Sequence, residues 1–229
     1  MVAITGGDLV GLIGVYAYVF AAATVVCLLA NRLSNPRKVM HVLTGGIVLF
    51  WWAFDTREVM AGLAAFPFVV VLLLSSPKSP IGPLKRSYLG AITDEGHDYG
   101  LVMYAISWTI IAYAMFDHML AASIAIAAMS FGDGTGGLVG RMFGKTEFMA
   151  NKTVEGTLGV FGATVLSVAV LVWFYCDVVG AASIRPDNTL LFALAVGAFV
   201  SCLEAVSPGK MDNLVVPLTT GAYLALLGV

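Results

Sequence analysis

The most unusual polar residue is Asp133, which lies between Gly132 and Gly134 in an apolar, glycine-rich segment. Its carboxylate could bind a metal ion, while glycine backbone N–H groups can approach a phosphate closely. Glycines also recur at every fourth position, and on a helix they would form a packing stripe: Gly132, Gly136, Gly140 and Gly144. Packing does not account for Asp133, because an ionisable side chain at membrane depth costs roughly 2.5–3.5 kcal/mol. We therefore expect Asp133 to be functional.

A second polar cluster follows along the chain and contains Lys145, Lys152, Thr153 and Glu155. Two lysines close to a buried aspartate suit a nucleoside triphosphate bridged by Mg²⁺, because phosphoryl transfer needs cations that neutralise developing charge. The alternative is a basic flank of a membrane span, with a helix that starts at Thr153. We favour a functional role that rests mainly on Lys152 and Glu155.

A third cluster, Arg37, Lys38 and His41, follows Pro36, which suits the first position of a helix. The positive end of that helix would favour an anion such as a phosphate. Arg37 and Lys38 alone are equally well explained as signals of membrane orientation. The histidine just inside the span favours the functional interpretation.

The fourth cluster lies near the C-terminus and contains Glu204, Asp212 and Asn213. Glu204 falls inside the end of an apolar segment, where solvation alone would not place a carboxylate. It could bind a metal ion together with Asp133 and Asp212, or accept the proton of a hydroxyl group. A tight turn with Asp212 capping the last helix is the alternative.

The chain that carries these clusters has 229 residues, of which 59% are hydrophobic and 11% charged, and its mean hydropathy is +0.93. A soluble domain normally carries about 25% charged residues. We predict an all-α, polytopic membrane helix bundle that forms a single transmembrane domain over residues 1–229. It has room for about eight spans of roughly 20 residues each, which we place at 8–30, 39–54, 58–75, 98–116, 119–140, 154–179, 189–206 and 214–229.

The basic residues predict the orientation of these spans. Ten of the twelve Lys and Arg residues fall in alternate connections, near 31–38, 76–97, 141–153 and 207–213. The excess of positive charge predicts that these motif-bearing loops are cytoplasmic and that both termini are extracytoplasmic. The connection over 77–96 could contact anionic headgroups or help to cover a nucleotide. The net charge of −2 gives no reason to expect nucleic acid as a partner.

Taken in order, four motifs resemble those of the CTP-dependent polyprenol kinase family, which includes dolichol kinases, phytol kinases and a fungal diacylglycerol kinase. The motifs are Arg37-Lys-x-x-His41, Gly132-Asp133 with a later Gly144-Lys145, Lys152-Thr-Val-Glu155-Gly, and Asp212-Asn-Leu-x-x-Pro217. The resemblance implies transfer of the γ-phosphoryl group of CTP, or of another nucleotide, to the hydroxyl of a lipid alcohol such as phytol, geranylgeraniol, a polyprenol or dolichol. It also implies a requirement for Mg²⁺.

The predicted site combines the resemblance with the residue chemistry. The predicted catalytic residues are Asp133, Lys152, Glu155 and Asp212, and the predicted metal ligands are Asp133, Glu204 and Asp212. The predicted nucleotide-binding residues are Arg37, Lys38, His41, Gly132, Gly134, Lys145, Lys152, Thr153 and Asn213. We expect a multi-pass protein of the cell membrane, or of the endoplasmic reticulum if the source is eukaryotic. The alternatives are a diacylglycerol kinase, a phosphatidate cytidylyltransferase-like enzyme and, in a different class, a membrane transporter.

Overall fold

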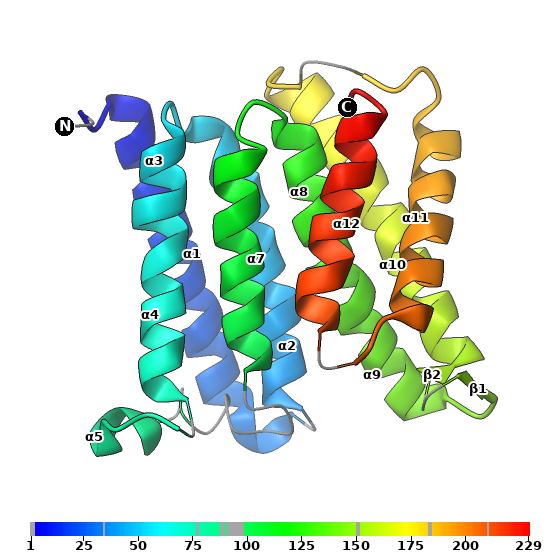
Figure 1. Ribbon diagram of the computed structural model, residues 1–229, viewed down its shortest axis with the longest axis horizontal. Helices are drawn as coiled ribbons and strands as arrows, with labels where there is room; N and C mark the ends of the chain where they lie inside the picture. The colour runs from blue at the N-terminus through cyan, green and yellow to red at the C-terminus, as the bar shows by residue number, and fades with distance from the viewer. Residues whose placement is uncertain are drawn as a thin grey trace. The chain divides into compact units, whose positions relative to one another are not determined.

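The computed structural model describes residues 3–33, 35–76, 78–87, 90, 99–149, 152–182, 185–209 and 211–229. Within these residues the chain is helical except for its connections and one short β-hairpin, which confirms the all-α prediction. The helices form two compact units, residues 1–114 and 115–229. The sequence analysis did not predict this division. Figure 1 shows the elements of each unit.

Unit 1 contains four main helical runs, of which neighbouring ones pack side by side. Their ends follow local signals: Thr5 caps the first run and Asn35, ahead of Pro36, caps the second. This confirms the predicted helix start at Pro36. The elements are α1 (Gly6–Leu29) with η1 (Ala30–Arg32), α2 (Pro36–Thr44) with η2 (Gly45–Ala53), α3 (Arg57–Val59) with η3 (Met60–Ala65) and α4 (Phe66–Ser75), then α5 (Gly82–Lys85) and α7 (Gly100–Ala114).

The second run of unit 1 is longer than its residue count suggests. Its first nine residues, α2, are α-helical, and its next nine residues, η2, form a 3₁₀ helix. A 3₁₀ helix rises about 2.0 Å per residue against 1.5 Å for an α-helix, so the run is about 31 Å long. That length matches the hydrocarbon thickness of a bilayer, roughly 30 Å.

One end of unit 1 is held together by a buried carboxylate that the sequence analysis did not single out. The side chain of Asp8 is fully buried near the start of α1. It accepts hydrogen bonds from the backbone N–H groups of Thr5, Asp55 and Thr56, at 3.0–3.1 Å, and from the Thr56 hydroxyl. Since several donors offset its desolvation, Asp8 ties the start of α1 to the start of α3.

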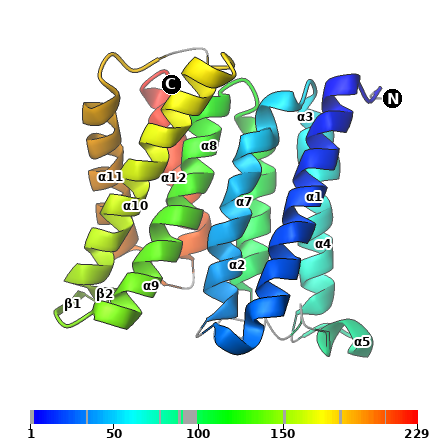
Figure 2. The same cartoon turned by 180° about the vertical axis from the view of Figure 1, so that it is seen from behind.

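Unit 2 also contains four main helical runs, and its hairpin lies between α9 and α10 (Figures 1 and 2). The hairpin is antiparallel and pairs Glu147 with Thr153. Two of the runs contain π-helical turns, η4 between α8 and α9 and η5 at the end of α10. The elements are α8 (Met119–Ala127), η4 (Ala128–Asp133), α9 (Gly134–Phe143), β1 (Glu147–Met149), β2 (Lys152–Thr153), α10 (Val154–Trp173), η5 (Phe174–Val178), α11 (Thr189–Val206) and α12 (Asp212–Leu226).

The glycine stripe of α9 packs against α10, as its spacing predicted. A Cβ atom added at Gly136 would lie 2.3 Å from the Val160 side chain and 3.0 Å from the Gly156 carbonyl oxygen. One added at Gly140 would lie 3.3 Å from the Gly156 Cα. The two helix backbones therefore touch along this stripe, which leaves no space for side chains there.

In the part of the chain that the structure describes, four helices are long and apolar enough to cross a membrane: Gly6–Arg32, Arg57–Ser75, Val154–Val178 and Thr189–Val206. Their outward faces carry large apolar side chains, such as Leu28 (78% exposed) and Leu166 (67% exposed). Apolar surface of this extent is typical of contact with lipid rather than with water. The count of eight spans and the orientation of the termini remain predictions.

Candidate active site

A buried ion pair between Lys152 and Glu204 marks one end of unit 2. Lys152 belongs to the hairpin strand that leads into α10, and Glu204 lies in the last turn of α11, 52 residues later in the chain. The side chain of Glu204 is 6% exposed and that of Lys152 is 19% exposed. Charges this buried are stable only when paired. The pair therefore joins two of the clusters predicted from the sequence.

The loop between α9 and the hairpin is held by Glu155, in the first turn of α10. Its carboxylate accepts hydrogen bonds from the backbone N–H groups of Lys145 (3.1 Å) and Thr146 (3.3 Å). A carboxylate also interacts favourably with the positive end of its own helix. Thr153 caps this helix by accepting a hydrogen bond from the Gly156 N–H at 3.1 Å, which confirms the predicted helix start. Glu155 thus positions the loop that carries Lys145.

Asp133 lies deeper in unit 2, at the end of the π-helical turn η4, and is 4% exposed. A Cβ atom added at the preceding Gly132 would lie 2.6 Å from the Thr164 hydroxyl and 3.8 Å from the Val200 side chain. Val200 precedes Glu204 by one turn of α11, so Gly132, the neighbour of Asp133, packs against α11 about one turn before Glu204. Turns of π-helix inside longer helices are frequent at functional sites.

The last helix of unit 2 begins at Asp212, next to the end of α11 in the chain. The Asp212 carboxylate accepts a hydrogen bond from the Asn213 N–H at 2.8 Å. The N-cap residue is Met211, so the alternative in which Asp212 itself caps the helix is wrong. Asn213 is buried. Four residues later in the same helix, Pro217 has no backbone N–H group, so it cannot donate the usual helical hydrogen bond to the Asn213 carbonyl group.

Two buried hydroxyl groups near this end were missed by the sequence analysis. Ser207 directly follows α11 and Thr157 lies in the first turn of α10, and neither hydroxyl has a hydrogen-bond partner among the described residues. Buried polar groups nearly always have one. A polar ligand bound at this end of unit 2 would supply the missing hydrogen-bond partner. No sequence signal distinguishes these residues, because Ser and Thr near helix ends commonly act as caps.

The acidic residues of unit 2 are more compatible with a metal ion that binds together with a nucleotide than with a metal site formed by protein ligands alone. Among the described residues, no three Asp, Glu, His or Cys side chains come together as a metal-binding group. Mg²⁺ typically uses only one or two carboxylates together with water and substrate phosphates. That Asp133, Asp212 and Glu204 bind a metal ion stays a prediction.

The remaining predicted residues, Arg37, Lys38 and His41, lie in the first two turns of α2 in unit 1. His41 is 4% exposed and packs edge-on against Tyr104, with 4.7 Å between ring centroids. Residues 77, 88, 89 and 91–96 of the loop proposed to cover a nucleotide lie outside the described residues.

Comparison with known proteins identifies the family. No family model matches the chain, and no solved structure matches it. The chain is 32% identical to the phytol kinase of Synechocystis, over 93% of each chain. It is 28% identical to phytol kinase 1, chloroplastic, of Arabidopsis thaliana, over 93% of this chain and 73% of the relative. A probable phytol kinase 1, chloroplastic, of Oryza sativa is 29% identical, over 92% of this chain and 70% of the relative. The chain therefore belongs to the phytol kinase family, which confirms the predicted membership of the polyprenol kinases.

Proposed function

We propose that the protein is an integral-membrane kinase that transfers the γ-phosphoryl group of CTP to the hydroxyl group of an isoprenoid alcohol such as phytol. The observation that carries the proposal is the Lys152–Glu204 pair, which gathers cationic and acidic groups at one end of unit 2. The names of the relatives support a kinase with an alcohol acceptor. Another nucleoside triphosphate in place of CTP is compatible with the same residues.

The proposed reaction joins two substrates without a covalent enzyme intermediate. The alcohol oxygen forms a bond to the γ-phosphorus, the bond from that phosphorus to the β–γ bridging oxygen breaks, and CDP leaves. Lys152 and Lys145 would neutralise charge on the phosphate oxygens. Glu204, beside Lys152, would accept the proton of the alcohol. Glu155 is a positioning residue, because it holds the loop that carries Lys145.

Asp133 and Asp212 are the residues that we propose for Mg²⁺, which would supply further charge neutralisation at the phosphates. The burial of Asp133 supports this role, since a buried carboxylate has few other reasons to be kept in an apolar segment. Gly134 directly follows Asp133 and begins α9, so its backbone lies next to that of Asp133.

We propose that eight helical runs span the membrane, with the motif-bearing loops on the cytoplasmic side and both termini outside. The length of the α2–η2 run, about 31 Å, supports counting it as a span although it has only eighteen residues. The short connections between α1–η1 and α2, between η2 and α3, between α7 and α8 and between α11 and α12 support the alternation of direction.

Product analysis tests the proposed reaction. Purified protein is incubated with Mg²⁺, CTP labelled in the γ-phosphate and one lipid at a time: phytol, geranylgeraniol, a polyprenol, diacylglycerol or phosphatidate. We expect labelled isoprenyl phosphate and an equal amount of CDP. Label in diacylglycerol alone would indicate a diacylglycerol kinase. Pyrophosphate release with phosphatidate would indicate a cytidylyltransferase, and no product with any lipid would favour a transporter.

A further inference from the structure

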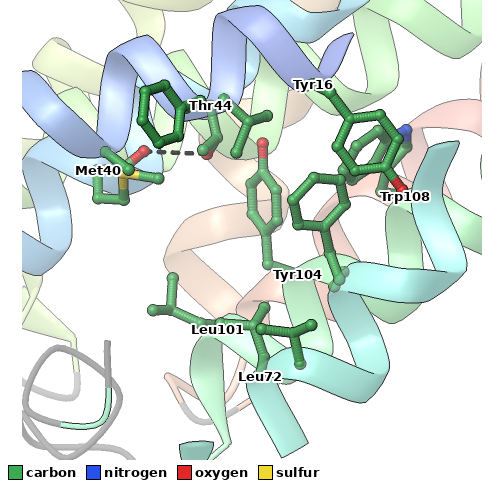
Figure 3. Close-up of a pocket in the computed structure, with 13 residues that line it drawn as sticks. Tyr16, Met40, Thr44, Leu72, Leu101, Tyr104 and Trp108 are labelled. Carbon is green, nitrogen blue, oxygen red and sulfur yellow. Dashed lines mark hydrogen bonds between the residues drawn. The ribbon is translucent and has the colours of Figure 1, made fainter. Parts of the chain in front are cut away.

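Unit 1 contains an apolar cavity of about 300 Å³ that none of the predicted site residues lines. It lies between α1, α2, α4 and α7, and Figure 3 shows the ring of Tyr104 in its middle. Leu72 and Leu101 lie on one side of that ring, whereas Tyr16 and Trp108 lie together on another. The volume is at the lower end of the range of ligand pockets, roughly 300–1,000 Å³.

The cavity is accessible from the lipid-facing surface of unit 1. Three of its lining residues are also exposed on the outside: Phe20 (75%), Val71 (45%) and Tyr16 (41%). Phe20 and Tyr16 belong to α1, and Val71 belongs to α4. The Tyr16 hydroxyl donates a hydrogen bond of 2.7 Å to the Leu63 carbonyl, and its ring stacks on Phe68. An apolar molecule could therefore enter sideways from the bilayer, between α1 and α4.

The lining is apolar along the length of the cavity. From Leu101 to Trp108 it follows seven residues of α7, or about 10 Å, which suits an extended chain rather than a compact headgroup. Aromatic rings make up much of the wall and provide large, rigid apolar faces. The hydroxyl of Thr44 donates to the carbonyl groups of Met40 (2.9 Å) and His41 (3.0 Å) on its own helix.

One end of the cavity adjoins the polar start of α2. Met40 lines the cavity, and the next residue, His41, packs against Tyr104, which also lines it. Arg37 and Lys38 lie one turn earlier on the same helix. The cationic residues of α2 thus lie about one helical turn from a lining residue of the cavity, although none of them lines it. That arrangement matches a molecule with one long apolar chain and one small polar end.

We propose that this cavity binds the apolar chain of the isoprenoid alcohol. The inference rests on the proposed function for the identity of the ligand, but it makes a separate statement about where the chain is bound. Branched isoprenoid chains fill a wide, aromatic-walled slot better than a single straight acyl chain, because close packing leaves fewer voids.

Binding to the full chain in lipid nanodiscs tests the inference without any nucleotide. Ala23 lines the cavity from α1, whereas Ala21 on the same helix is exposed and does not line it. Ala23→Leu would fill part of the cavity, and we expect it to weaken phytol binding by about tenfold or more. The matched control Ala21→Leu should change the affinity by less than about twofold. Binding of a short prenyl alcohol should be much less affected by Ala23→Leu.

A photoreactive phytol analogue gives a second readout that does not depend on a variant. We expect adducts on α1, α4 and α7 at cavity-lining residues, and competition by phytol but only weakly by a straight-chain fatty alcohol. Equal effects of the two alanine variants, adducts only outside the cavity, or equal competition by the fatty alcohol would overturn the inference. If phytol binds in the cavity but no phosphate is transferred to it, only the proposed function is refuted. If phosphate is transferred and Ala23→Leu does not change phytol binding, only the cavity assignment is refuted.

Discussion

Removing one partner of the Lys152–Glu204 pair should destabilise unit 2 strongly. Lys152→Met leaves the Glu204 carboxylate, 6% exposed, without its cation. Breaking a buried ion pair in this way costs about 3–5 kcal/mol, because a buried charge remains uncompensated. Since Lys152 keeps 19% exposure and water can reach the pair, we expect a loss near the lower limit, about 3 kcal/mol.

A double variant separates stability from chemistry. Lys152→Met combined with Glu204→Leu removes both charges, and the free energy of unfolding should return to within about 1 kcal/mol of the wild type, because an apolar pair often replaces a buried ion pair at little cost. Phosphoryl transfer should remain lost, since Lys152 and Glu204 are proposed to act on the substrates.

The assay is equilibrium unfolding in mixed detergent micelles, followed by circular dichroism, with phosphoryl transfer measured on the same preparations. Lys145→Met is the stability control, because the Lys145 side chain is exposed, and it should stay within about 0.5 kcal/mol of the wild type. The reasoning is refuted if Lys152→Met is as stable as this control, or if the double variant is no more stable than Lys152→Met.

Three further predictions concern packing and positioning. Gly136→Ala should destabilise the protein by about 3 kcal/mol, because its Cβ would lie 2.3 Å from the Val160 side chain, whereas Gly162→Ala, with nothing within 4 Å, should be neutral or stabilising; thermal unfolding would compare them. Asp8→Ala should lower the free energy of unfolding by about 2 kcal/mol, since it leaves part-buried backbone N–H groups without their acceptor, and an unchanged unfolding midpoint would contradict this. Glu155→Gln should raise the KM for CTP more than it lowers kcat, because it loosens the loop that carries Lys145. A larger effect on kcat than on KM in steady-state kinetics would contradict the role of Glu155 as a positioning residue.

Local signals in the sequence predicted the helices well. Pro36 and Thr153 begin helices as their residue types indicate, and the four-residue spacing of Gly132, Gly136 and Gly140 predicted a close helix contact. These features depend on neighbours along one helix, so they can be predicted without knowing the rest of the fold.

Features that depend on distant partners could not be predicted in the same way. Asp8 resembles an ordinary helix cap in the sequence, and its bonds to Asp55 and Thr56 appear only once α1 and α3 are placed together. The pairing of Lys152 with Glu204 joins residues 52 positions apart, so the sequence supported each as a candidate but not their contact. The 3₁₀ geometry of Gly45–Ala53 also had no local signal, because that apolar run suits an α-helix equally well.

Binding of CTP to the purified chain and to Asp133→Asn, in the presence of Mg²⁺, tests whether the polar end of unit 2 holds a metal-bound nucleotide. The variant keeps the size of the side chain but removes the charge, and circular dichroism would establish that both proteins are folded. We expect the wild type to bind CTP only with Mg²⁺, and Asp133→Asn to lose at least about tenfold in affinity, or 1.4 kcal/mol. Equal, metal-independent affinity for both proteins would contradict a metal-bound nucleotide at this site.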